Sequence, residues 1–171
     1  MSNADLKPRA GRVWIGLGAN IGDAAETFTR AREALSQYLS ELQSSSLYLT
    51  LPYGDTDQDN FTNAVVCGYC ELQALELLSA LQAIEHSLGK RKLRPNGPRN
   101  IDLDILFWGD HQADLPGLKI PHPRAIERDF VLLPMQEIDP LWQDPRDGIP
   151  ISELIHNLNE HYFTGTRLPW V

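Results

Sequence analysis

Two segments of the chain carry apolar residues at the spacing of an amphipathic helix. The first begins near Asp23, a residue that favours helix N-caps, and its apolar positions are Phe28, Ala31, Leu35, Tyr38 and Leu42. The second ends at Gly89, which suits the left-handed position after a helix, and its stripe is Leu72, Leu75, Leu78, Leu81, Ile84 and Leu88. We therefore expect one helix over residues 23–42 and another over residues 72–88.

Runs rich in β-branched and aromatic residues predict strands between and after these helices. The clearest runs are residues 13–18, 61–69 and 101–108, with a weaker one at 46–51 and a short one at 118–120. The order of strand, helix, strand, strand, helix and strand resembles the split β-α-β arrangement. We expect an α+β fold with a ferredoxin-like antiparallel sheet and helices packed mainly on one face.

The remaining segments predict loops and short helices. Residues 52–60 are polar and rich in turn-forming residues, which indicates a surface loop, and residues 89–99 form a basic loop. Residues 125–138 have a helical pattern that Pro134 should interrupt, and residues 151–158 predict a last short helix.

Length and charge limit the classes of protein to consider. A chain of 171 residues with 42% hydrophobic content suits one core, so we expect a single domain over residues 12–171 after a flexible tail, residues 1–11. The formal net charge of −8 disfavours nucleic acid or an anionic membrane as a partner. No apolar run is long enough for a membrane span or a signal peptide, which predicts a cytoplasmic protein.

Cys67 and Cys70 have the C-x-x-C spacing of some redox and zinc sites. They fall in a predicted strand, whereas redox dithiols usually open a helix, and no second Cys or His pair completes a zinc site. We expect two reduced, partly buried thiols.

Asp102 and Asp104 form the most informative local pattern. Residues two apart on a strand share a face, so these two carboxylates should project together while Leu103 faces a core. Paired hard oxygen ligands favour Mg²⁺, with phosphate oxygens completing its coordination. Taken alone, the same pattern also fits the solvated face of a sheet.

The segment before this strand is strongly basic. Residues 90–99 contain five of the fifteen Lys and Arg residues of an acidic chain. A cationic loop beside a carboxylate pair suits a polyphosphate, because cations neutralise charge on the transferred group. Without that neighbour, the loop would be interpreted as a solvated charge run.

Glycines follow the first predicted strand, at Gly16, Gly18 and Gly22. A dinucleotide-binding fingerprint also requires a parallel second strand that ends in an acidic residue, and residues 47–50 contain none. We therefore expect these glycines to allow close approach of the backbone to a ligand, or a sharp turn.

Three motifs, in this order, resemble those of the 6-hydroxymethyl-7,8-dihydropterin pyrophosphokinase family. Residues 18–23 resemble its G-S-N-x-G-D opening, residues 61–65 its Y/F-x-N segment, and residues 97–106 its G-P-R-T-x-D-L-D-I-L signature. Residues 121–122 resemble its P-H motif and residues 128–132 its R-x-F-V-L motif. The likeness extends over residues 13–140.

This resemblance implies a folate-biosynthesis enzyme that transfers pyrophosphate from ATP to 6-hydroxymethyl-7,8-dihydropterin and releases AMP. It implies that Asp102 and Asp104 hold two Mg²⁺ ions, and that Lys90, Lys92 and Arg99 act on the phosphates. The residues that match the family's ATP site are Gln82, Glu85, Ile105, His122 and Arg128. Those that match its pterin pocket are Thr50, Leu51, Tyr53, Phe61, Asn63 and Phe130. The family is generally monomeric, so we expect a monomer whose partners are these two substrates.

The chain departs from the family pattern at three places. Lys90 and Lys92 replace an R-x-R pair, and lysine lacks the planar fork that grips phosphate at two points. Asn96 replaces a Trp found in some members, and Ala19 replaces Ser. Two alternatives therefore stay open: a member of the family that binds its ligands without turnover, and a non-catalytic RNA-binding module, which the acidic charge disfavours.

Overall fold

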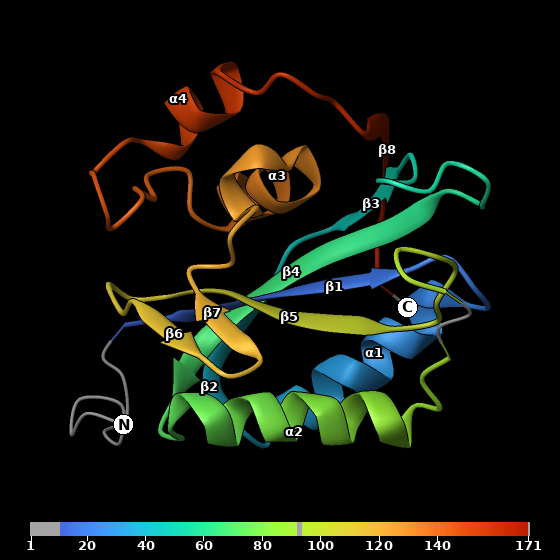
Figure 1. Ribbon diagram of the computed structural model, residues 1–171, viewed down its shortest axis with the longest axis horizontal. Coiled ribbons are helices and arrows are strands. Elements are labelled where there is room, and N and C mark those ends of the chain that lie inside the picture. The colour runs from blue at the N-terminus through green and yellow to red at the C-terminus, as the bar shows by residue number, and fades with distance from the viewer. Residues whose placement is uncertain (1–10, 92–93, 171) are drawn as a thin grey trace.

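The computed structural model describes residues 11–91 and 94–170, so most of the expected N-terminal tail and Lys92 lie outside the described residues. The elements are, in chain order, β1 (Val13–Ala19), α1 (Ala24–Leu35), β2 (Leu39–Ser44), β3 (Leu47–Thr50), β4 (Phe61–Cys70), α2 (Ala74–Ser87), β5 (Asp102–Trp108), β6 (Ala113–Leu115), β7 (Leu118–Ile120), the 3₁₀ helix η2 (Ala125–Glu127), α3 (Asp129–Ile138), α4 (Ile151–His156) and β8 (Phe163–Leu168). Figure 1 shows their arrangement.

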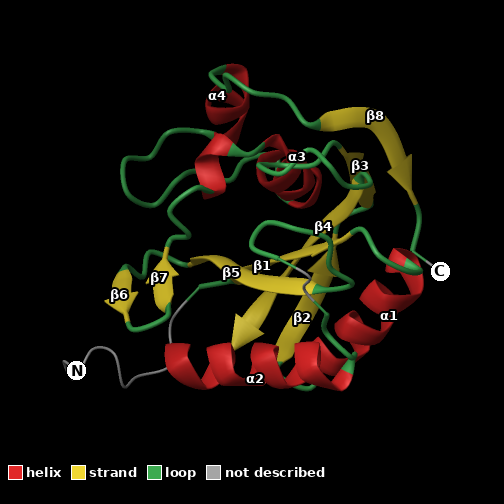
Figure 2. Ribbon diagram, turned by 45° about the vertical axis from the view of Figure 1, so that its right-hand side comes forward, coloured by secondary structure: helices red, strands yellow, loops and turns green. Residues whose placement is uncertain are grey.

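The main sheet is antiparallel and runs in the order β5-β1-β4-β3-β8, with β2 also paired to β4. Strand β1 lies between β4 and β5, and all seven of its residues pair with β4. In this register Gly16 lies opposite Asp104 and Gly18 opposite Asp102. Strands β6 and β7 form a separate hairpin beside the sheet (Figure 2).

Helices α1 and α2 cover one face of the sheet and form the larger core with it (Figure 1). Alternate strand residues, such as Ile15, Leu17 and Leu103, point into this core, as the period of a strand requires. The helices contribute the buried side chains of Phe28, Ala31, Leu35, Leu77, Leu81 and Ile84. The strong apolar stripe of α2 was thus a correct guide to its packing.

The opposite face carries helices as well, which corrects the expectation of helices mainly on one face. Helix α3 lies on this face and α4 lies beside α3 (Figure 1). The reason is a second set of alternate apolar residues, including Trp14, Val65 and Leu106, which Leu132 and Met135 of α3 bury. This second core leaves room on the same face for a recess at Gly16 and Gly18.

The first predicted helix is shorter than expected. It ends at Leu35, and Leu39–Ser44 form β2 in place of the last helical turns. Tyr38 and Leu42 fit the helical spacing although neither is in the helix. Both pack against the same core as α1, but from a non-helical backbone. The cooperative pairing of β2 with β4 decides between the two structures, and that pairing is not visible in the local pattern.

Two further local expectations differ from the structure. The break in residues 125–138 lies at Arg128, whose backbone is extended, whereas Pro134 sits inside a continuous α3 and removes one backbone hydrogen bond from it. Strands β6 and β8 were not predicted, and β8 is an exposed edge strand with little alternation. The other predicted strands, α2 and the short helix near residue 151 are confirmed, within a few residues at their ends.

Cys67 and Cys70 are free and buried, as expected. Burial raises the pKa of both thiols, which disfavours reactive thiolates. Within residues 11–91 and 94–170, no helix has both the length and the hydropathy that a membrane span requires.

The packing of α3 leads to a stability prediction. Leu132 is fully buried in the second core, so Leu132→Ala should lower the free energy of unfolding by about 2–5 kcal/mol through lost burial and a new cavity. Leu141 is 87% exposed, and Leu141→Ala should change it by less than about 0.5 kcal/mol. Urea denaturation of both variants measures the difference, and equal losses would contradict this account of α3.

Candidate active site

A recess lies on the α3 face of the sheet, where β1, β4 and β5 meet the loops before β4 and β5. We call it the aromatic recess; its lining includes Gly16, Gly18, Tyr53, Asn63, Asn96, Arg99, Asp102, Asp104, Arg128 and Phe130. Seven of these ten were expected site residues, drawn from segments far apart in the sequence. The sheet and α3 therefore bring together seven of the sixteen site residues that the sequence suggested.

The glycines of β1 form the floor of this recess. A Cβ atom on Gly18 would lie 3.0 Å from Oδ1 of Asn63, and one on Gly16 would lie 3.4 Å from the side chain of Leu106. The contact at Gly18 is tighter than side chains normally make, whereas the one at Gly16 is close to an ordinary contact distance. Side chains at either position would occupy part of the recess floor, and the expected close approach of this backbone to a ligand stays a prediction.

The two aspartates share a face of β5, as predicted. Asp102 contacts two cations: Nζ of Lys90 donates to its Oδ1 at 2.8 Å, and Nε of Arg99 lies 2.7 Å from its Oδ2. Asp104 is an exposed residue, yet the protein atoms that crowd its carboxyl, followed by the charges of Asp102 and Glu85, raise the pKa of Asp104 to about 6. The site thus gathers negative charge that a bound cation would stabilise.

Glu85 lies beneath this pair rather than in the recess. It is 7% exposed on α2, and its Oε2 accepts hydrogen bonds from Nζ of Lys90 at 2.6 Å and from the backbone N–H of Leu103 at 3.0 Å. Although burial opposes it, hydrogen bonds to Asp102 and Glu85 raise the pKa of Lys90. Lys90 is therefore a charged group held between α2 and β5.

Arg99 is held by its backbone and by its side chain. Its N–H donates to Oδ1 of Asn20 at 3.0 Å, and its carbonyl accepts from the N–H of Asn20 at 2.9 Å. The guanidinium donates to the carbonyl of Gly97 and lies 4.6 Å from the centre of the Phe61 ring. Arg99 thus connects the carboxylate pair with the aromatic side of the recess.

The loops before β4 and β5 contact each other over the site. Arg94 forms an ion pair with Asp55 at 2.6 Å, and Gln58 donates to the carbonyl of Asn96 at 2.7 Å. Nδ2 of Asn20 donates to Gln58 at 2.9 Å, which ties both loops to the turn after β1. The sequence predicted both loops, but not these contacts between them.

The residues matched to the pterin pocket surround the other side of the recess. Tyr53, Asn63 and Phe130 line it, and the guanidinium of Arg128 lies 4.7 Å from the centre of the Tyr53 ring. Thr50 is buried and accepts a hydrogen bond from Nδ2 of Asn63 at 2.7 Å. Neither Thr50 nor the two remaining matched residues line the recess: Phe61 is buried beneath Arg99, and Leu51 is 49% exposed.

A second recess lies across Asp104, between β5 and the β6–β7 hairpin. We call it the hairpin recess; its lining includes Leu103, Asp104, Ile105, Leu118, Lys119 and His122. Of the residues matched to the ATP site, Ile105 and His122 lie here and Arg128 lines the aromatic recess, whereas Gln82 is exposed on α2 and lines neither. Asp104 is the acidic residue that both recesses share.

His122 is neutral in this environment. Burial, followed by the charges of Arg128 and Arg124, lowers the pKa of His122 to about 4. Its Nδ1 accepts a hydrogen bond from the N–H of Arg124 at 3.2 Å, which leaves Nε2 as the protonated nitrogen.

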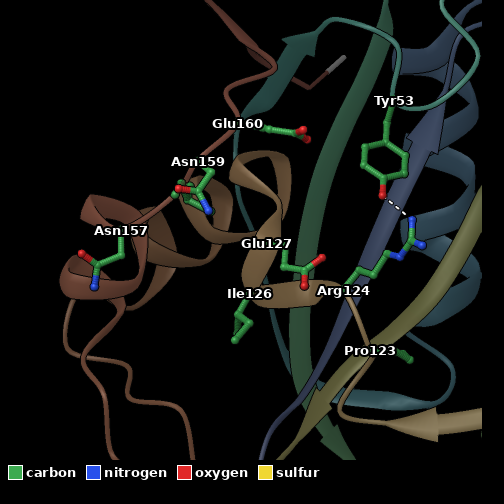
Figure 3. A pocket seen from close by; sticks show the side chains of 9 residues that line it. Tyr53, Pro123, Arg124, Ile126, Glu127, Asn157, Asn159 and Glu160 are labelled. Carbon is green, nitrogen blue, oxygen red and sulfur yellow. Dashed lines mark hydrogen bonds between the residues drawn. The ribbon is translucent and has the colours of Figure 1, made fainter.

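A third cavity, the outer pocket, opens beside Tyr53 (Figure 3). The hydroxyl of Tyr53 and the guanidinium of Arg124 are hydrogen-bonded at its edge. The opposite wall comes from residues 157–160, which follow α4. Neither Arg124 nor this C-terminal segment was an expected site element, and no motif in the sequence marks them.

The acidic residues suit a divalent cation only in part. Among the residues that the structure describes, no group of three or more His, Cys, Asp or Glu side chains could hold a metal by itself. Two carboxylates beside basic residues instead fit Mg²⁺ that completes its coordination with water and phosphate oxygens. The donor set could therefore hold a metal only if other ligands completed its coordination.

Comparisons with known proteins agree with this arrangement. A family model described as 7,8-dihydro-6-hydroxymethylpterin-pyrophosphokinase (HPPK) matches residues 14–140. The 2-amino-4-hydroxy-6-hydroxymethyldihydropteridine pyrophosphokinase of Synechocystis sp. is 37% identical over 161 residues, which cover 93% of this chain and 82% of that protein. The protein of the same name from Pseudomonas aeruginosa is 40% identical over 147 residues, which cover 84% and 90%.

Solved structures support the fold. A crystal structure of HPPK-DHPS from Plasmodium falciparum aligns with a TM-score of 0.70 at 16% identity, covering 91% of this chain and 45% of that one. The chain thus spans less than half of that protein, and at this identity the likeness concerns architecture alone. The family match over residues 14–140 and the identities of 37% and 40% place this chain in the 7,8-dihydro-6-hydroxymethylpterin-pyrophosphokinase family.

Proposed function

We propose that the chain transfers the pyrophosphate group of ATP to 6-hydroxymethyl-7,8-dihydropterin, with AMP as the other product, as a step of folate biosynthesis. The observation that carries this proposal is the position of Asp104, which lines both the aromatic recess and the hairpin recess. A transfer between two substrates requires that the acceptor and the donor bind on either side of one charged centre. The two recesses that share Asp104 provide such a pair of binding positions.

The aromatic recess suits the pterin. A flat polar heterocycle binds well against aromatic rings, and here Tyr53 and Phe130 provide them. Asn63 offers both a donor and an acceptor to the edge of such a ring, and its hydrogen bond to Thr50 orients the amide. The hairpin recess would then receive the nucleoside part of ATP against Ile105 and His122, with Lys119 nearby.

Asp102 and Asp104 would hold Mg²⁺ together with the ATP phosphates. The metal would supply charge stabilisation for the attacking and leaving oxygens. The raised pKa of Asp104 fits this role, because it reflects burial of the carboxyl and then the two neighbouring carboxylates, whose charge a divalent cation would offset.

The chemistry requires positioning and neutralisation of charge rather than a covalent intermediate. The hydroxymethyl oxygen of the pterin would attack the β-phosphorus of ATP in line as AMP leaves. Lys90, Arg99 and Arg128 surround the carboxylate pair and would neutralise charge on the transferred group. The contact of the loops across Asp55 and Arg94 would exclude water that competes as an acceptor.

The lysine at position 90 is compatible with this role. Its ammonium group contacts both Glu85 and Asp102. These two contacts require only a compact positive charge, not the planar guanidinium of an arginine. The proposal therefore assigns activity to this chain in spite of its departure from the family's R-x-R pattern.

We also infer that the domain has a ferredoxin-like core. The order β5-β1-β4-β3 with antiparallel neighbours, and α1 and α2 on one face, supports this inference. We propose that residues 12–171 work as one domain, because segments from β1 to α3 line the same recess, and as a monomer, as the resemblance to the family implies.

The direct test is release of AMP from ATP by the purified protein with Mg²⁺, in the presence and absence of 6-hydroxymethyl-7,8-dihydropterin. Pterin-dependent AMP is the expected result. Binding of both ligands without AMP would indicate a family member that has lost turnover, and would contradict the proposal.

Asp104→Ala should lower pterin-dependent turnover by about a thousandfold or more, because metal-based stabilisation of the transition state contributes several kcal/mol. The melting temperature should change little, since Asp104 is an exposed residue with no ion pair recorded among the described residues. Asp110→Ala is the matched control: Asp110 is exposed in the turn after the same strand and should leave the rate unchanged. Turnover by Asp104→Ala close to that of the wild type would refute the assignment.

His122 should remain neutral well below pH 7. Because its pKa of about 4 in the folded protein lies below the ordinary histidine pKa of about 6.5, the unfolded chain binds a proton between these pH values that the folded chain does not. Its contribution to stability is therefore complete above pH 6.5 and falls as the pH drops toward 4. An NMR titration of the imidazole measures this pKa, with the His122 signal assigned by its loss in His122→Gln. A titration midpoint near pH 6.5 would contradict the lowered pKa.

A further inference from the structure

The segment that follows α4 reaches the candidate site although the family match ends at residue 140. Its connection after α4 forms a wall of the outer pocket, seen opposite Tyr53 in Figure 3. It then brings Tyr162 against two rings of the aromatic recess. This part of the chain has no role in the reaction as derived above.

Tyr162 completes a cluster of three aromatic rings. Its ring centre lies 5.5 Å from that of Tyr53 and 5.7 Å from that of Phe130, and the centres of Tyr53 and Phe130 are 6.2 Å apart. All three contacts are edge-to-face, with interplanar angles of 60–79°. Such geometry is favourable for aromatic pairs and fixes the orientation of each ring relative to the others.

The backbone of Tyr162 is anchored on both sides. Its N–H donates to Oδ2 of Asp129 at 2.7 Å, and its carbonyl accepts from the N–H of Leu51 at 2.8 Å. The N–H of Phe163 donates to the same Oδ2 at 2.8 Å. Tyr162 is thus attached both to the start of α3 and to the end of β3, the two segments that lead to Phe130 and Tyr53.

Asp129 has the properties of a structural anchor. It is 2% exposed, and as the first residue of α3 its carboxylate lies where the helix dipole favours negative charge. Its chain neighbours are Arg128 and Phe130, which both line the aromatic recess. A shift of the anchored segment would therefore be transmitted to those residues.

The next residue, Phe163, begins β8 and serves a different part of the molecule. Its ring lies 5.1 Å from that of Tyr48 and takes no part in the three-ring cluster. Phe163 therefore provides a matched comparison: it has an aromatic side chain, shares the Asp129 anchor and is the chain neighbour of Tyr162.

We propose that Tyr162, seated by Asp129, is a positioning residue that holds Tyr53 and Phe130 in the orientation that receives the flat heterocycle of the acceptor. This inference rests on the proposed function and adds to it a determinant of pterin affinity outside the family-matched region. Tyr162 is absent from the lining of the aromatic recess, so it acts through the two rings rather than by touching the reacting atoms.

The test compares Tyr162→Leu, Tyr162→Phe and Phe163→Leu with the wild type in steady-state AMP release. Tyr162→Leu should raise the KM for the pterin by about three- to tenfold, the effect of one or two lost aromatic contacts. The KM for ATP should stay within about twofold, since the hairpin recess does not contact this cluster. Tyr162→Phe keeps the ring and loses only the hydroxyl bond to Glu160, so it should restore the wild-type KM.

Phe163→Leu should lower the melting temperature about as much as Tyr162→Leu and leave the KM for the pterin unchanged. The inference is overturned if Tyr162→Leu has the wild-type KM for the pterin, if it raises both KM values equally, or if Phe163→Leu has the same effect. Failure of the proposed function is distinct from these results, because it would appear as a wild-type protein that releases no pterin-dependent AMP.

Discussion

The pairing of β1 between β4 and β5 is the constraint on which the rest of the site depends. It sets Gly16 opposite Asp104, and Gly18 opposite Asp102 on one side and Asn63 on the other. Because the glycines carry no side chains, the carboxylates and the amide border an open recess instead of a filled core. A slip of one residue would turn these side chains to the opposite face and put apolar residues in their place.

The two faces of this sheet have different roles. The face under α1 and α2 is apolar along its length and supplies the larger core. The face under α3 is apolar where it meets Leu132 and Met135 and polar where the aspartates and Asn63 project. A rigid scaffold thus supports a site whose upper walls are loops, an arrangement common in enzymes because loops can vary while the support is retained.

Charge within the site is balanced locally although the chain as a whole is acidic. Lys90 and Arg99 contact Asp102, and Glu85 holds Lys90 from below, so the cations are positioned by the same carboxylates that they neutralise. Asp104 has no such ion pair among the described residues, and burial, followed by the charges of Asp102 and Glu85, raises its pKa. A polyphosphate with its metal would redistribute these contacts: the metal would take the carboxylates and the basic residues would turn to phosphate.

The sequence by itself determined the parts with strong local signals: the stripe of α2, the central strands, the shared face of Asp102 and Asp104, and the basic loop beside them. Its motifs also identified half of the residues that line the aromatic recess, but in the hairpin recess only Asp104, Ile105 and His122. Tertiary structure alone decided where β2 replaces a helix, that α3 covers the second face, and that Tyr162 joins Tyr53 and Phe130. These features depend on pairing and packing between residues distant in the chain. The apolar period of a helix, 3.6 residues, and that of a strand, 2 residues, do not indicate which distant surfaces will meet.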